Sequence, residues 1–355
     1  MKKSFKFLFF GAGPNQYNFI KHSIKKKNYN IVIHNKKKIK EKKFLDEFIY
    51  GSVYKKTKII SLLKKIKNNK NLDDIICRSS GPSIISAYKA DKYFGIGRVD
   101  RNLAYCVYSK FFLYKFLKKN RIPVIRSTVL KRLKKKIHIG SWVIKPDAPI
   151  VGKKFVYKIE NQNIKKNKFL NVKKSSDNKL VNISEFIPGR DISAIFFIKK
   201  KNKKRILLNL INEWNFFYNN QINLFNIKSV AGISTPPLKL KKTTLAKIKK
   251  ILNKVLKLFP NYYGLFVVSL RVNKDKIYVY EINLNMDSKY SKIIFPNFFN
   301  KKSIFDLEIN NLMNLNLGKF GHNKNKFLGI LGKNLIKDKF KYLNKIQKYG
   351  EIDLI

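Results

Sequence analysis

Glu281 and Asn283 are the two residues whose types and spacing point most directly to chemistry. They end the second of two stretches, residues 265–272 and 277–283, that are rich in β-branched and aromatic side chains. Residues 273–276 between them have the composition of a tight turn, so the sequence predicts a β-hairpin. A carboxylate and an amide at a strand end are oxygen ligands for a hard cation such as Mg²⁺, which often takes further ligands from water and substrate phosphates.

Alternation along the second strand predicts that Ile277, Val279, Glu281 and Asn283 share one face of this hairpin. That face would be apolar at first and would end in the two polar ligands. A strand that simply runs out into a polar loop would have the same residues. The rest of the chain must decide between a metal site and a strand end.

The strongly basic composition does not by itself indicate a nucleic-acid-binding protein. The 355 residues, enough for two or three domains, include 78 Lys and Arg but only 21 Asp and Glu, for a net charge of +57. Only nine of the basic residues are arginines, and the lysine runs are scattered along the chain, which is typical of compositional drift. Nonspecific attraction to polyanions is expected; specific nucleic-acid binding is an alternative that depends on charge alone.

The cysteines and histidines show no zinc-type spacing. Cys77 and Cys106 are therefore expected to be free thiols in a reducing, cytoplasmic compartment. The sequence contains no run of about 18 apolar residues, so a membrane-spanning helix is not expected. The first residues are predicted to form a buried strand that ends in a glycine turn, in preference to a signal peptide.

The first 34 residues predict the start of a Rossmann-like unit. Residues 4–10 form a strand, the sequence GAGPNQ at 11–16 turns into a helix, and residues 31–34 form a second strand. A dinucleotide site would require a third glycine at position 16 and an acid after the second strand. Gln16 and Asn35 occupy these positions, so NAD binding is not expected.

Several motifs, in their order along the chain, resemble the ATP-grasp superfamily over roughly residues 4–290. They are the GAGPNQ turn, the Ser109-Lys110 pair, SWVIKP at 141–146, VNISEFIPGRDISAIFFI at 181–198, and the Glu-x-Asn end of the hairpin. Within the superfamily, the chain resembles ligases of the carbamoyl-phosphate synthase and biotin carboxylase type. The resemblance implies an α/β and α+β fold, in which an N-terminal Rossmann-like pre-ATP-grasp domain precedes a two-lobed ATP-grasp domain.

The expected domains follow from this resemblance. They are the Rossmann-like domain at 1–105, the ATP-grasp domain at 106–300 with a small lobe at about 106–183 and a large lobe at about 184–300, and a C-terminal extension at 301–355.

The resemblance also assigns roles to individual residues. The nucleotide-binding residues would be Lys110, Lys145, Gly152, Lys153, Glu185, Phe186, Ile187 and Asp191. Of these, Lys110 and Lys145 would bind the phosphates, the backbone near 186 and 187 would bind adenine, and Asp191 would bind the ribose. The metal ligands would be Glu281, Asn283 and Ser269. Lys145 and Arg271 would act in catalysis.

Three positions depart from the family pattern. Ser269 stands where a second acid is usual, Asn285 where many members have arginine, and Phe155 where the phosphate-covering loop has a second glycine. Arg271, expected on the same strand face as Ser269, is a candidate to replace the missing positive charge.

The resemblance implies an ATP-dependent ligase that uses ATP and Mg²⁺ or Mn²⁺ to convert a carboxylate into an acylphosphate, which an amine or another nucleophile then attacks. A homodimer is compatible with this prediction, and no membrane partner is expected. The alternative is a degenerate ATP-grasp protein that binds nucleotide with little turnover.

Overall fold

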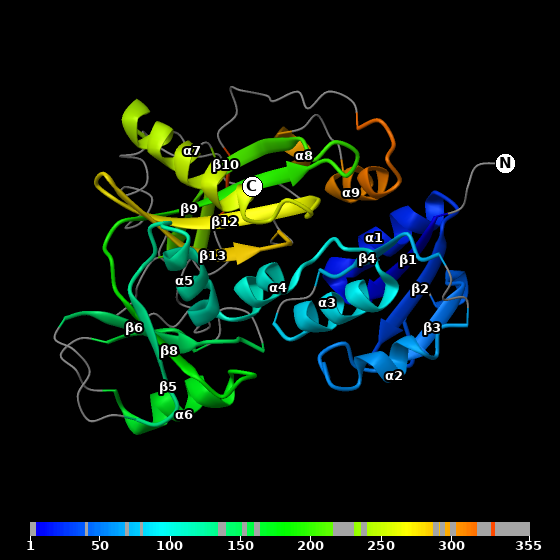
Figure 1. Ribbon diagram of the computed structural model, residues 1–355, viewed down its shortest axis with the longest axis horizontal. Helices are drawn as coiled ribbons and strands as arrows, with labels where there is room; N and C mark the ends of the chain where they lie inside the picture. The colour runs from blue at the N-terminus through cyan, green and yellow to red at the C-terminus, as the bar shows by residue number, and fades with distance from the viewer. Residues whose placement is uncertain are drawn as a thin grey trace.

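The computed structural model describes most of the chain. The described residues are 5–39, 42–67, 71–78, 81–133, 140–150, 155–159, 164–215, 231–235, 240–286, 291, 295–298, 303–317 and 328–330. Within them the strands form three β-sheets, which are separate groups of arrows in Figure 1. None of the helices in these segments combines the length and the apolar character needed to span a bilayer.

The N-terminal sheet is parallel, with the strand order β3-β2-β1-β4. Its elements are β1 (Lys6–Phe10), α1 (Pro14–Lys25), β2 (Tyr29–His34), the 3-10 helix η1 (Lys42–Phe44), β3 (Glu47–Tyr50), α2 (Ile59–Leu63), β4 (Asp74–Ile76) and α3 (Ser83–Phe94). Phe7 and Phe9 of β1 pack in one core with Phe19 of α1, while Leu8 and Phe10 pack in another core with α2 and α3. Because both faces are buried, β1 is a continuous apolar run, as expected for a parallel strand. The predicted Rossmann-like unit is confirmed.

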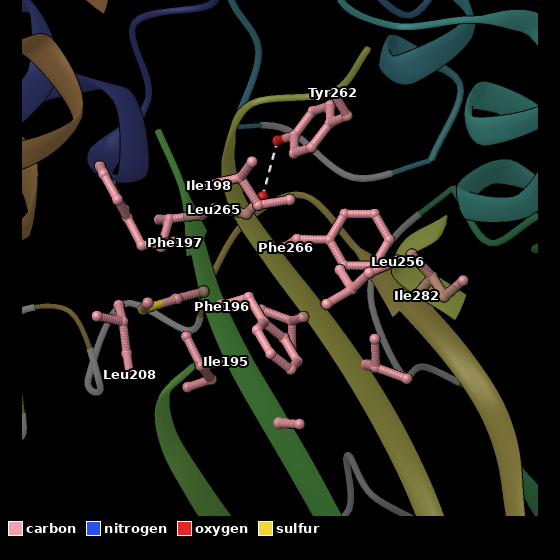
Figure 2. Close-up of a cluster of buried hydrophobic side chains, with 14 of the residues drawn as sticks. Ile195, Phe196, Phe197, Ile198, Leu208, Leu256, Tyr262, Leu265, Phe266 and Ile282 are labelled. Carbon is pink, nitrogen blue, oxygen red and sulfur yellow. Dashed lines mark hydrogen bonds between the residues drawn. The ribbon is translucent and has the colours of Figure 1, made fainter. Parts of the chain in front are cut away.

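The largest sheet is antiparallel, with the order β13-β12-β9-β10-β11-β14. Its elements are β9 (Arg190–Ile198), β10 (Arg205–Asn215), β11 (Ala231–Thr235), α7 (Lys242–Lys257), β12 (Gly264–Asn273), β13 (Lys276–Asn283), α8 (Phe295–Phe298), α9 (Ile304–Leu312) and β14 (Leu328–Ile330). The predicted hairpin is confirmed. Residues 240–259 have apolar side chains at helical spacing, which predicts a helix, and α7 lies there. In the core, Leu256 of α7 lies close to Phe266 of the sheet (Figure 2).

The third sheet is small and antiparallel, with the order β5-β8-β6-β7. Its elements are β5 (Ser127–Leu130), β6 (Trp142–Pro146), β7 (Tyr157–Ile159), α6 (Lys166–Lys174) and β8 (Val181–Glu185). Residues 162–178 are rich in lysine and asparagine, a composition that predicts a loop, but this prediction is wrong because α6 lies there. Phe169 and Val172 are three positions apart on this helix, and both are buried in the core formed with Trp142 and Ile144.

The many apolar and aromatic residues of 100–120 predict one helix, but the chain forms two, α4 (Arg101–Tyr108) and α5 (Lys110–Lys119). The break is at Ser109, whose backbone is extended, with φ −121° and ψ 122°. The Ser109 hydroxyl accepts a hydrogen bond from the Phe112 N–H at 3.1 Å and donates one to Asp147 at 2.7 Å. The Phe111 N–H donates to the other oxygen of Asp147 at 2.8 Å. Asp147 therefore fixes the start of α5 against the end of β6.

The β12–β13 hairpin contains a β-bulge that corrects one sequence prediction. Glu281 and Asn283 do not share a face with Ile277 and Val279, because the pairing skips one residue of β13 between Glu281 and Val279. An extra residue reverses the alternation of side chains. Ile277 and Val279 are consequently buried in the core, whereas Glu281 and Asn283 lie on the opposite face with Ser269.

Helix α9 is joined to the N-terminal sheet by a buried ion pair. Arg78, two residues after β4, donates from Nη1 to Glu308 Oε2 at 3.0 Å, and both side chains are less than one-tenth exposed. Burial raises the pKa of Glu308, and the nearby Arg78 charge opposes that rise. Sequence analysis assigns no role to the stretch that contains Glu308; in the structure it anchors the end of β4.

A second buried acid connects the N-terminal sheet to the large sheet. Asp74 of β4 is fully buried and accepts hydrogen bonds from Arg98 Nη1 at 2.9 Å, from the Tyr263 hydroxyl at 2.6 Å and from Lys200 Nζ at 3.3 Å. These contacts join four segments of the chain at one carboxylate.

We expect the substitution Asp74→Ala to lower the free energy of unfolding by about 3–5 kcal/mol, because the Arg98 charge would remain buried without its partner. Urea denaturation measures this quantity. Asp275→Ala, at an exposed acid in the β12–β13 turn, is the control and should change it by less than about 0.5 kcal/mol. A loss below about 1 kcal/mol for Asp74→Ala would contradict the expectation.

Candidate active site

Lys110 and Glu281 are 171 residues apart in sequence, and they meet where α5 packs beside β13. Lys110 Nζ donates to Glu281 Oε1 at 2.9 Å, and the two side chains are 19% and 21% exposed. Lys110 is the first residue of α5, whose start is fixed by Asp147, and the β-bulge turns Glu281 to this side of the sheet. The predicted phosphate-binding lysine and the predicted metal ligand are therefore in direct contact, and both are partly open to a ligand.

Lys145 is the last residue but one of β6 in the small sheet, and charged residues of other elements act on it. Burial lowers the pKa of its ammonium group to about 7, and the positive charges of Lys110 and Arg271 act in the same direction. The negative charges of Glu281 and Asp191 oppose this effect. Lys145 also lines one cavity with Lys110, the residue that bonds to Glu281, so Lys145 and Glu281 belong to one site between the small and the large sheet.

Two rows of polar residues lie on the site-facing side of the large sheet. In the first row Glu281 pairs with Ser269, and Ser269 pairs with Ser193; the two serine hydroxyl oxygens are 2.9 Å apart. In the second row Arg271 pairs with Asp191, and Arg271 Nε lies 3.0 Å from Asp191 Oδ1. The structure thus brings both predicted catalytic cations, Lys145 and Arg271, to the same region as the predicted metal ligands.

A small cavity separates the small sheet from the hairpin. It is lined by Lys145, Asn182, Ser184 and Ser127 on one side and by Tyr280 on the other. Asn182 Nδ2 donates to Ser127 Oγ at 2.8 Å, and Asn182 Oδ1 is buried with no hydrogen-bond partner among the described residues. The cavity therefore contains an acceptor available to a ligand, next to the lysine on the neighbouring strand.

Asn182 and Ser184 are not among the predicted site residues, although the sequence contains a signal for them. They alternate with Val181 and Ile183, whose side chains are in the core of the small lobe. On a strand, this period of two places the polar residues on the opposite face, away from the core.

Residues Glu185, Phe186 and Ile187 lie where the chain leaves the small sheet and enters the large one. Glu185 is exposed, and its N–H donates to the Arg126 carbonyl at 3.0 Å. The Phe186 N–H donates to the Ser141 carbonyl at 2.9 Å. Since both of these amide donors are used within the small lobe, neither is available to a base without rearrangement.

The loop that the family resemblance predicts to cover the phosphates, the phosphate-covering loop, is described only at its two ends. The predicted ligands Gly152 and Lys153 lie outside the described residues. Phe155, which stands where a second glycine is usual, has φ of 59°, in the left-handed region that glycine adopts without strain. Phe155 therefore adopts the backbone conformation that a glycine would adopt at this position, and this costs on the order of 1–3 kcal/mol of conformational free energy.

The predicted metal ligands Glu281, Asn283 and Ser269 share one face of the hairpin. They offer a carboxylate, an amide and a hydroxyl oxygen, which are hard donors suited to Mg²⁺ or Mn²⁺. The described part of the chain contains no group of three or more His, Cys, Asp and Glu residues that could hold a metal. The donor set fits a cation for which Glu281 is the negatively charged protein ligand and phosphates supply many of the other ligands.

A sequence profile for the ATP-grasp domain matches residues 107–286, just over half of the 355 residues. No curated protein sequence matches the chain significantly.

Solved structures of several ligases are similar to this fold. An L-amino acid ligase from Bacillus licheniformis has a TM-score of 0.67 at 14% identity, covering 90% of this chain and 78% of that one. N5-carboxyaminoimidazole synthetase from Staphylococcus aureus, complexed with ADP, has a TM-score of 0.66 at 15% identity, covering 98% and 88%. Phosphoribosylglycinamide synthetase from Anaerococcus prevotii has a TM-score of 0.60 at 15% identity, covering 89% and 76%.

The predicted fold class is confirmed, because a parallel N-terminal sheet is followed by two antiparallel lobes. The profile match covers both lobes and includes Lys110, Lys145 and Glu281. The chain belongs to the ATP-grasp family.

Proposed function

We propose that this protein is an ATP-dependent ligase that joins a carboxylate to an amine or another nucleophile through an acylphosphate. The observation that carries the proposal is the convergence of Lys110 and Lys145 with Glu281 between the two lobes. Ammonium groups held beside a metal-binding carboxylate suit a triphosphate, whose transfer requires positioning and charge neutralisation more than covalent chemistry.

In this proposal Lys110 and Lys145 bind ATP phosphates, and Arg271 adds positive charge beside them. Three cations with only two carboxylates, Glu281 and Asp191, give the site a positive excess. Such an excess favours a polyanionic ligand and costs little once the phosphates are bound. Asp191 is the proposed ribose acceptor, and Arg271 fixes its position.

Glu281, Asn283 and Ser269 are the proposed ligands for Mg²⁺ or Mn²⁺. The cation would neutralise charge on the transferring phosphoryl group. Ser269 supplies a neutral hydroxyl where the family usually has an acid, so the protein offers the cation one carboxylate fewer. In this proposal the positive side chains around the site therefore neutralise a larger part of the phosphate charge.

The base is proposed to lie in the cavity between Tyr280 and the small sheet. Ile187 is the favoured backbone contact, since the amides of Glu185 and Phe186 are used elsewhere. Asn182 Oδ1 is a further acceptor for the adenine amino group. Gly152 and Lys153 are retained as proposed phosphate ligands of the covering loop.

The domain limits remain proposals, at residues 105, 183 and 300. The passage of the chain between sheets at 185–190 and the break at Ser109 are compatible with boundaries close to the first two. A reducing compartment and a homodimeric assembly also remain expectations.

A degenerate nucleotide-binding protein is the second candidate. The specific observation in its favour is the Ser193–Ser269 hydrogen bond, which occupies the position of the usual second acid. Tight Mg-ATP binding without ADP release, in the presence of pooled amino acids and small carboxylates, would favour this alternative.

We expect the substitution Glu281→Ala to reduce Mg²⁺-dependent ADP release with pooled carboxylates and amines by about 10²–10³-fold, since it removes the only carboxylate among the proposed ligands. Chelation of divalent cations should reduce the wild-type rate to a similar level. Asp275→Ala, at an exposed acid of the same hairpin, is the matched control and should retain full activity. Unchanged turnover in Glu281→Ala would exclude Glu281 as a required ligand.

The lowered pKa of Lys145 predicts a pH dependence of Mg-ATP binding. The group is charged below its pKa of about 7 and loses its proton above it, while bound phosphate favours the charged form. The dissociation constant should therefore be nearly constant below pH 7 and rise by up to about tenfold per pH unit above it, with uptake of a proton on binding. Isothermal titration calorimetry in buffers of different ionisation enthalpy measures both effects.

The matched variant for this experiment is Lys145→Arg, because its guanidinium remains charged throughout the range. Its dissociation constant should not change between pH 7 and 9. An equally steep pH dependence in wild type and Lys145→Arg would assign the titration to another group.

A further inference from the structure

The base of the phosphate-covering loop is bound along its length to residues 175–178 of the same lobe. The Ala148 N–H donates to Ser176 Oγ at 3.1 Å, and the Asp177 N–H donates back to the Ala148 carbonyl at 2.8 Å. The Ile150 N–H donates to the Ser175 carbonyl at 3.1 Å. Any displacement of residues 175–178 must therefore move the base of the loop.

Residues 175–178, the hydrogen-bonded strip, are in turn bound to the N-terminal domain through Lys56. Lys56 Nζ donates to the Asp177 carboxylate and to the Tyr108 hydroxyl, the latter at 2.8 Å, and lies 4.5 Å from the centre of the Tyr108 ring. Lys89 Nζ donates to the Lys56 carbonyl at 3.0 Å and fixes the backbone from which Lys56 extends. Burial and the Asp177 hydrogen bond raise the pKa of Tyr108, so its hydroxyl remains a donor to that carboxylate.

The N-terminal domain also touches the loop base directly, at Gly81. This residue follows β4, has φ of 71°, and lies so close to the Pro149 carbonyl oxygen that a Cβ atom on it would overlap that oxygen. Two separate contacts, Lys56 to Asp177 and Gly81 to Pro149, therefore join the N-terminal domain to the few residues from which the loop begins.

We propose that Lys56 is a positioning residue for ATP binding: through Asp177 it lets the N-terminal domain set the position of the phosphate-covering loop. This inference rests on the proposed function, because it takes residues 147–155 as the loop that covers the phosphates. Lys56 itself makes no contact with the phosphates in this proposal; its effect on them passes through the hydrogen-bonded strip at 175–178.

The ion pair has the properties of a positioning contact more than those of a stabilising one. The Lys56 and Asp177 side chains are 32% and 22% exposed, and partly exposed ion pairs contribute little to the free energy of unfolding. Loss of Lys56 should therefore leave the fold intact while freeing the loop. The effect should appear for ligands with a triphosphate and not for the nucleoside alone.

The experiment compares wild type, Lys56→Met, Lys56→Arg and Lys55→Met. Calorimetry measures the dissociation constants of Mg-ATP and of adenosine, and hydrogen–deuterium exchange without nucleotide follows the amides of residues 147–155. We expect Lys56→Met to weaken Mg-ATP binding by about tenfold, to leave adenosine binding unchanged and to speed exchange at the loop base. Lys56→Arg, which keeps the charge, should recover most of both effects. Lys55→Met, at an exposed neighbouring lysine, should behave as wild type.

A second variant reaches the same loop from the other contact. Gly81→Ala should speed exchange at the loop base and weaken Mg-ATP binding without altering the Lys56–Asp177 pair. Unchanged exchange at residues 147–155 in both Lys56→Met and Gly81→Ala would overturn the inference. Equal weakening of ATP and adenosine binding would do so too, because it would indicate a general structural role.

The two proposals fail in different ways. If wild type binds neither Mg-ATP nor adenosine, the proposed function is wrong, and the exchange of the loop amides still decides whether Lys56 positions the loop. If wild type binds Mg-ATP and Lys56→Met binds it equally well, the proposed function stands and the role of Lys56 is excluded.

Discussion

An ammonium group held between two sheets, with the carboxylates that stabilise it, Glu281 and Asp191, on the opposite sheet, is the constraint on which the rest of this site depends. Removing Lys145 from water lowers its pKa to about 7, and Glu281 and Asp191 only partly offset that effect. The cost is tolerable if an anion completes the site. The fold meets this requirement by fixing both sides: Asp147 holds the start of α5, and hence Lys110, while the pairing of β12 with β13 holds Glu281.

One extra residue in β13 decides which side chains face this ammonium group. Without the bulge, Glu281 and Asn283 would lie in the core with Ile277 and Val279, where an unpaired carboxylate would cost several kcal/mol. With it, Ile277 and Val279 stay in the core, and Glu281 and Asn283 lie on the opposite face with Ser269. The bulge thus buries the apolar residues and turns the proposed ligands to the candidate site, and bulges often re-aim side chains in this way.

The departures from the family pattern change residue types more than backbone geometry. Phe155 keeps a glycine-like φ of 59°, and Ser269 keeps the position opposite Glu281 while its hydroxyl bonds to Ser193. The charge of the site changes more than its shape, because one acid is absent and Arg271 is bound to Asp191. A site of this kind would depend strongly on the cations of both lobes, and on the N-terminal domain that contacts the covering loop.

The sequence by itself determined the local elements and the candidate residues. Patterns of a few residues predict the glycine turn after β1, the lysine near the end of β6, the hairpin and the amphipathic helix α7. It did not determine that a bulge in β13 turns Glu281 away from the face of Val279, or that α6 forms within a lysine-rich stretch. Nor could it pair Arg78 with Glu308 or Lys110 with Glu281, which are 230 and 171 residues apart. Local patterns record which face of an element is apolar, whereas these pairings depend on which distant surfaces bury one another, and only the tertiary structure decides that.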